Sequence, residues 1–206
     1  MAISFCLDWP IVNLVKWLNP KGLPGDVERT LQSFKEFGQP VAIIVAFLLI
    51  FTLDKPRRRM LLRLLLCVLL PSVLVWSAKL VVHRLRPHRV DEYSTTLGLG
   101  FFLGSEPQKP YLAPPLADQN KTTTDGKLDS SDMQSFPSAH TATAFGLAVG
   151  LSGLYPAGEW IFYGLAVGCG FHRIIFDAHW FSDVVAASLI GVFISRAAWR
   201  WRNKGY

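Results

Sequence analysis

Long apolar stretches alternate with short polar segments along most of this chain. Each long stretch holds about 17 residues or more, and together they occupy 37–53, 60–82, 137–155, 160–176 and 183–199. A helix of roughly 20 mostly apolar residues spans a membrane, and about 17 is the lower limit. Several stretches are flanked by Trp or Tyr, which are enriched where a membrane meets water. The pattern predicts an all-α, polytopic membrane bundle of about five transmembrane helices.

The beginning of the chain follows a different pattern. Apolar side chains at helical spacing, such as Leu14 and Leu18, predict a short amphipathic helix, and a second apolar stripe follows within 27–34. Polar residues interrupt the segment too often for the apolar core of a signal peptide. We expect an amphipathic interfacial segment at 1–36 ahead of a membrane domain at 37–206. A cap packed on the bundle is the alternative.

Composition agrees with a membrane protein. Of the 206 residues, 50% are hydrophobic and only 17% are charged, and the mean hydropathy is +0.29. A soluble helical bundle of this size would normally carry more charge. The net charge of +6 suits either nucleic acid or anionic lipid. Because the basic residues lie beside apolar stretches, we expect lipid and no nucleic-acid partner.

Positive charge in short segments orients the predicted bundle. Four Lys or Arg residues fall within 54–59, and four more follow position 195. Cytoplasmic loops carry an excess of such residues, so we expect both segments inside and the protein in the cytoplasmic (inner) membrane. The acidic segment 88–135 then forms an irregular loop on the periplasmic or extracytoplasmic side. Such a loop can be a lid over a site or a connector, and both remain open.

Three cations stand at the predicted outer ends of these helices. Lys79 and Arg86 are seven residues apart, which is two helical turns, and Arg173 lies near the end of the fourth stretch. A guanidinium fork matches phosphate oxygens, and an ammonium supplies a compact charge. Basic side chains at helix ends also commonly reach toward lipid headgroups, which is the alternative for Lys79 and Arg86.

The third apolar stretch begins with a helix-start pattern. Pro137 suits the first turn, and Ser135 or Ser138 can cap it. Free N–H groups at a helix start attract anions. Ser138 and the amide of Ala139 can therefore donate to phosphate oxygens while His140 reaches a leaving oxygen. A helix cap beside an interfacial histidine is the alternative.

His179 and Asp183 are four residues apart, so one helical turn would bring their side chains together. A carboxylate that accepts from one ring nitrogen leaves the other nitrogen free to attack. A His and an Asp at this spacing can also bind zinc. Three nearby cations would repel a divalent ion and attract an anion, so we expect neither a metal nor another cofactor.

The pattern K-x6-R-P, then P-S-x-H, then R-x5-H-x3-D resembles the type-2 phosphatidic acid phosphatase family, which shares its site with the vanadium haloperoxidases. The resemblance implies that His179 is a nucleophile forming a phosphohistidine, that Asp183 orients it, and that His140 is the general acid. The phosphoryl oxygens would be bound by Lys79, Arg86, Ser138, the Ala139 amide and Arg173. The chain looks most like the short bacterial members of the family.

Two positions depart from the family pattern. Ala139 stands where the family usually has Gly, and His172 stands where it usually has Ser. Ala139 keeps its N–H, so the amide contact survives if the backbone needs no positive φ. His172 replaces a hydroxyl with an imidazole and is a possible accessory residue that changes a phosphate contact. The family also often has six spans.

The resemblance implies a membrane phosphatase for a lipid phosphate or pyrophosphate. Undecaprenyl pyrophosphate, phosphatidylglycerophosphate, phosphatidate and lipid A phosphate are the substrates that it suggests. A lipid phosphotransferase using the same intermediate and a non-catalytic lipid-phosphate binder or transporter are the alternatives. The two histidines and the aspartate favour catalysis, because anion binding alone needs only the cations. The oligomeric state stays open.

Overall fold

The computed structural model describes residues 6–18, 23–82, 84–89 and 134–201. Within these ranges the chain is helical, and the only β-type pairing is an isolated bridge between Arg84 and Gln134. The α-helices are α2 (Asp8–Leu18), α3 (Gly25–Glu36), α4 (Pro40–Leu53), α5 (Leu61–Val81), α6 (Ala139–Leu154), α7 (Glu159–Ile175) and α8 (Phe181–Trp201). Short 3-10 helices η1 (Lys55–Met60), η2 (Pro87–Arg89) and η5 (Pro156–Gly158) accompany them. The all-α expectation is confirmed.

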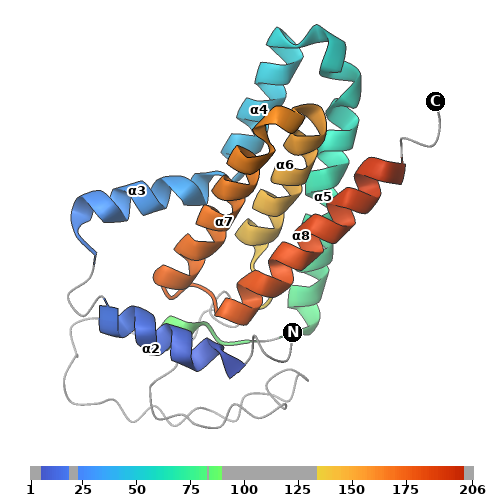
Figure 1. The fold of residues 1–206 in the computed structure, drawn as a ribbon. Helices are drawn as coiled ribbons and strands as arrows, with labels where there is room; N and C mark the ends of the chain where they lie inside the picture. The colour runs from blue at the N-terminus through green and yellow to red at the C-terminus, as the bar shows by residue number, and fades with distance from the viewer. Residues whose placement is uncertain (1–5, 19–22, 83, 90–133, 202–206) are drawn as a thin grey trace, which may run out of the picture.

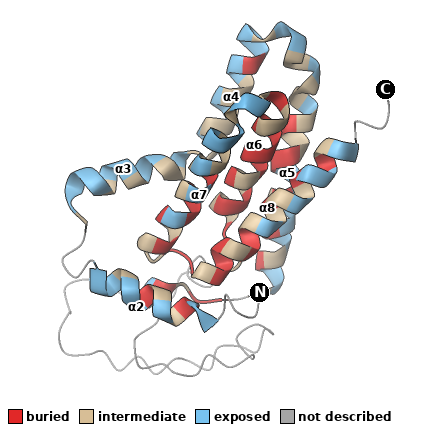
Figure 2. Ribbon diagram, in the orientation of Figure 1, coloured by how far each residue is buried: buried red, intermediate tan, exposed pale blue. Residues whose placement is uncertain are grey.

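Helix α6 is the centre of the bundle. It packs against α5, α7 and α8, and α5 also packs against α8. Figure 2 shows that buried residues are concentrated on α6 and on the sides of the neighbouring helices that face it. Close packing depends on small residues, because a Cβ added to Gly146 would collide with the backbone carbonyl of Cys67 on α5. The start of α6, which carries His140, is therefore held firmly among three helices.

The outer surface of the bundle is apolar. Large hydrophobic side chains such as Ile44, Leu80, Trp160 and Phe193 are more than half exposed. A surface of this kind needs an apolar environment. By length and composition, Lys55–Val81 and Phe181–Trp201 can cross a membrane, and α3 with α4, bent by 60° at their junction, would make a third if they form one span.

The membrane helix bundle is thus confirmed, but the individual helices vary in length. Helices α6 and α7 contain 16 and 17 residues, and α4 contains 14. These are short for a complete crossing. Five crossings therefore stay a prediction.

The beginning of the chain contains two helices, as the apolar stripes predicted. Helix α3 lies transverse to the bundle helices and projects to one side (Figure 1), and it contacts α7. Helix α2 contacts α7 and α8, with Asp8 and Val12 buried, and the ring of Trp9 meets Trp180 edge-on at 5.4 Å. Helix α2 therefore packs on the end of the bundle where α7 ends and α8 begins. Most of the predicted loop at 88–135 lies outside the described residues.

Candidate active site

The three sequence motifs meet at one end of the bundle. Helices α5 and α7 end there, and α6 and α8 begin there (Figure 1). This arrangement brings together the last turn of α5 with Lys79, the first turn of α6 with His140, and the last turn of α7 with Arg173. His179 lies in the loop between α7 and α8, and Asp183 lies in the first turn of α8.

His179 is oriented by a backbone carbonyl. The side chain is 2% exposed, and its Nδ1 atom lies 2.6 Å from the carbonyl oxygen of Ser135. A carbonyl oxygen can only accept, so Nδ1 carries the proton and the lone pair lies on Nε2. Burial lowers the pKa of His179 to about 4, outweighing the opposing effect of the Asp183 carboxylate. The imidazole is therefore neutral at pH 7, as a nitrogen nucleophile must be.

Asp183 stands beside this imidazole and is held by several donors. Its Oδ2 atom lies 3.6 Å from His179 Nδ1, farther than the Ser135 carbonyl. The carboxylate is fully buried and accepts from the Ser135 hydroxyl at 2.5 Å, from the Trp180 backbone N–H at 3.0 Å, and from Arg84. Its main geometric role is to place a negative charge next to the ring that the carbonyl orients.

Ser138 and the start of α6 form one wall of the site. Ser138 is fully buried, its hydroxyl accepts from Thr141 at 2.9 Å, and its N–H donates to the Asp183 carbonyl oxygen at 3.3 Å. No described side chain caps the first turn of α6. The early N–H groups of a helix have no acceptor within the helix, so those of Ala139 and His140 can serve an anion.

The cations surround the same end of the bundle. Lys79 is 6% exposed, and its ammonium donates to the Gln134 carbonyl at 2.5 Å. The positive charges of Lys79, Arg86 and Arg173 act on one another, which places them in one electrostatic group. The buried Nε of Arg173 has no hydrogen-bond partner among the described residues. A buried donor without an acceptor is consistent with a site that binds an anion.

The remaining histidines differ in their surroundings. His140 is half-buried at the start of α6, and its backbone carbonyl packs so tightly against Gly38 that a Cβ there would approach to 2.5 Å. His172 is buried and stacks on Phe176, with ring centroids 4.3 Å apart. Among the described residues, nothing bonds to His172 Nδ1. The contact that fixes the imidazole of His172 is thus the stack on Phe176, and its accessory role stays a prediction.

Sequence reasoning missed a buried polar group behind the site. Arg84, Asp8 and Ser182 are all buried and hydrogen-bonded to one another, and Arg84 also bonds to Asp183. In the sequence, Asp8 is one of the polar residues that interrupt the first apolar segment. The signal that could have found it is physical, since a carboxylate among apolar residues near a membrane requires a partner.

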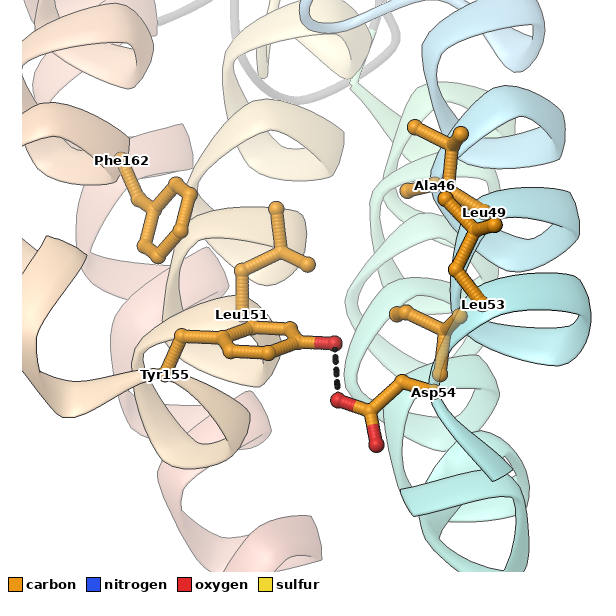
Figure 3. Close-up of a pocket in the computed structure, with 8 residues that line it drawn as sticks. Ala46, Leu49, Leu53, Asp54, Leu151, Tyr155 and Phe162 are labelled. Atoms are coloured by element: carbon orange, nitrogen blue, oxygen red, sulfur yellow. Dashed lines mark hydrogen bonds between the residues drawn. The ribbon is translucent and has the colours of Figure 1, made fainter. Parts of the chain in front are cut away.

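Two cavities of the described part of the chain are not lined by the predicted site residues themselves. The larger one, about 490 Å³, lies between α4, the end of α6 and the start of α7 (Figure 3), at the end of the bundle away from the site (Figure 1). Apolar side chains such as Leu49 and Leu151 line it, and the Tyr155 hydroxyl donates to Asp54 at 2.9 Å at its rim. A smaller one, about 290 Å³, is lined by Lys16 and Asp177 among others. Neither is lined by Lys79, Arg86 or Arg173.

Comparisons with known proteins agree with the motifs. The crystal structure of LpxE from Aquifex aeolicus has a similar fold, with a TM-score of 0.63 and 23% sequence identity over 91% of this chain and 93% of that chain. At that identity the likeness concerns the fold. No curated protein matches this chain significantly. The sequence model of the PAP2 superfamily matches residues 58–206 and so includes every motif from Lys79 to Asp183. The resemblance drawn from the motifs is therefore confirmed, and the chain belongs to the PAP2 superfamily.

Proposed function

We propose that this protein is a metal-independent membrane phosphatase that hydrolyses a lipid phosphate or pyrophosphate through a phosphohistidine on His179. The observation that carries the proposal is the neutral, buried imidazole whose Nδ1 proton goes to the Ser135 carbonyl. This geometry leaves Nε2 as a nucleophile at the end of the bundle where the cations gather. Family membership supports a phosphatase as the type of enzyme.

The first step is attack of His179 Nε2 on phosphorus. The new N–P bond forms as the bond from phosphorus to the leaving oxygen breaks, and His140 donates a proton to that oxygen. Lys79, Arg86 and Arg173, together with the amides at the start of α6, stabilise the phosphoryl oxygens as their charge spreads in the transition state. Asp183 stabilises the positive charge that the phosphorylated ring carries.

Water completes the reaction. His140, now neutral, takes a proton from water as the water oxygen attacks phosphorus and the N–P bond breaks. Phosphate leaves, Nε2 regains its lone pair, and His140 regains its proton. Each residue ends the cycle in its starting state, so the set of residues needs no further reactant besides water.

Two properties favour a lipid as the substrate, and a third favours one face of the membrane for the site. The site lies at the end of a bundle with an apolar outer surface, where we expect the lipid headgroups. Each methylene of a lipid tail adds about 0.8 kcal/mol of membrane affinity, so long-chain substrates are already concentrated in that layer. The basic residues within 54–59 lie at the other end of the bundle, which favours an extracytoplasmic site in the cytoplasmic membrane. The headgroup can be any of the four that the family resemblance suggests.

Rapid quench with a lipid carrying ³²P in its phosphate tests the nucleophile. We expect label on the wild-type protein that is lost in acid and stable in base, and neither label nor turnover in His179→Ala. His88→Ala is the matched control because His88 is exposed and lies outside the proposed machinery. Substantial turnover in His179→Ala, with His88→Ala behaving as wild type, would reject the proposed mechanism.

A further inference from the structure

A buried carboxylate from the first described helix lies directly behind the active-site aspartate. Asp8, in the first turn of α2, is 3% exposed. Its Oδ1 accepts from the Ser182 backbone N–H at 2.7 Å, and its Oδ2 accepts from the Ser182 hydroxyl and from Arg84 Nη2, each at 2.6 Å. Ser182 immediately precedes Asp183. Asp8 therefore holds the backbone and the side chain next to the residue that supports His179.

Arg84 joins the two carboxylates. Its Nη2 branch donates to Asp8, and its Nη1 branch donates to Asp183 and to the Ser182 hydroxyl. Arg84 is 4% exposed, and its guanidinium lies over the Trp180 ring, 5.1 Å from its centroid. A planar guanidinium can donate hydrogen bonds to two carboxylates from N–H groups in fixed directions, whereas a lysine ammonium is a compact charge without that geometry. The position of Asp183 thus depends on a residue more than 170 positions earlier in the chain.

The charges of this group explain why two carboxylates are needed. Asp8, Arg84 and Asp183 together carry one net negative charge. Without Asp8, the full charge of Arg84 would act on Asp183 and the group would be neutral. A neutral group would stabilise the positively charged, phosphorylated ring of His179 less well. Asp8 therefore preserves the negative charge that the reaction uses, although the Arg84 guanidinium lies between it and Asp183.

We propose that Asp8 is a positioning residue that acts through Arg84 to hold Asp183 beside His179 and to keep this buried group negatively charged. The inference rests on the proposed role of His179. Asp8 lies ahead of the residues that match the superfamily model, so membership does not assign it a role. The consequence is that the site is complete only when α2 is docked on the start of α8.

The test is the kinetics of Asp8→Asn on whichever lipid phosphate the wild type hydrolyses. We expect kcat to fall by about 10- to 100-fold, because small displacements of reacting groups can cost about 100-fold in rate. We expect KM, and the inhibition constant of inorganic phosphate, to stay within about threefold, because Asp8 touches no group that binds phosphate. A role in stability alone would lower the melting temperature and the yield of folded protein but not the kcat of the folded enzyme.

Matched variants distinguish an effect on the position of Asp183 and the charge of the buried group from a loss of packing in α2. Asp26→Asn removes an exposed carboxylate from the neighbouring helix α3, and Val12→Ala removes buried apolar contact from α2 itself. Both should keep kcat within about threefold of wild type. Asp8→Glu keeps the charge and should recover part of the loss. Arg84→Lys keeps the buried positive charge but loses the two-branched guanidinium that joins Asp8 to Asp183. This variant tests the same connection if Asp8→Asn does not fold. It should lower kcat and leave KM unchanged.

Two results would overturn the inference. The first is a folded Asp8→Asn, or in its place Arg84→Lys, with kcat within about threefold of Asp26→Asn. The second is a loss confined to KM. If His179→Ala is inactive in the same assays, such a result rejects only the role of Asp8 and leaves the proposed function standing. If His179→Ala keeps its activity, the proposed function fails and this inference fails with it.

Discussion

Replacing Asp183 by Asn separates two roles that a carboxylate beside a histidine can have. It can fix which ring nitrogen carries the proton, and it can stabilise positive charge on the ring. In this protein the Ser135 carbonyl lies 2.6 Å from His179 Nδ1, whereas Asp183 Oδ2 lies 3.6 Å away. The proton position should therefore survive Asp183→Asn, and only the charge should be lost.

The distances set the expected size of the effect. A unit charge about 4 Å away contributes about 4 kcal/mol at an effective dielectric constant of about 20. Since about 1.4 kcal/mol is tenfold in rate, that is an upper limit of about 10³-fold. Arg84 bonds to the same carboxylate and offsets part of its charge, so we expect kcat to fall about 10²-fold. Where a carboxylate alone fixes the ring, as in serine-protease triads, the same change costs about 10⁴-fold.

Single-turnover rates of phosphohistidine formation give the measurement. Asp177→Asn is the matched control, since Asp177 lies in the same loop and its φ of 48° suits Asn as well as Asp. We expect it to react within about threefold of wild type. Thermal melts of both variants check that the loss is not one of folding. A loss of 10⁴-fold or more in folded Asp183→Asn, equal to that of His179→Ala, would refute the role given to the Ser135 carbonyl.

Three further predictions concern metal, substrate and topology. Orthovanadate should inhibit and EDTA should not, because vanadate copies the geometry that the cations stabilise; activity lost in EDTA and restored by zinc or magnesium would favour a metal site instead. Initial rates in mixed micelles should give a higher kcat/KM for a long-chain lipid phosphate than for a water-soluble ester of the same headgroup, because the tail concentrates the lipid at the site; a higher value for the soluble ester would indicate a general phosphatase. Single cysteines within 54–59 should be labelled only from the cytoplasm and those within 106–129 only from outside, and the reverse pattern would place the site on the cytoplasmic face.

The sequence alone determined the helices and the end of the bundle where the chemistry lies. Hydropathy places α5 and α8 within a few residues of their observed limits, because an apolar stretch must be shielded from water wherever it lies in the chain. Alternation of direction between successive helices then brings Lys79, His140 and Asp183 to the same end. The charges of Lys79, Arg86 and Arg173 act on one another in the structure, while the roles given to these cations and to the histidines stay predictions.

Helix limits were less well determined where local geometry competes with hydropathy. The predicted span at 37–53 begins at Pro40 in the structure, because the chain bends by 60° between α3 and α4. His179 and Asp183 were expected to pair across a helical turn, but α8 begins at Phe181, so His179 lies in the loop before it. The spacing of four residues was informative, yet it did not determine which atom would hold the imidazole.

Only the tertiary structure decided the partners of the reacting groups. The Ser135 carbonyl reaches His179 across 44 positions, and Asp8 reaches Ser182 across 174. Contacts of this range follow from how helices pack, and no local periodicity encodes them. A backbone carbonyl has the same chemistry in every residue, so no residue type could mark the one that orients His179. Asp8 was visible as a charge in an apolar segment, but its role required the docking of α2 beside the start of α8.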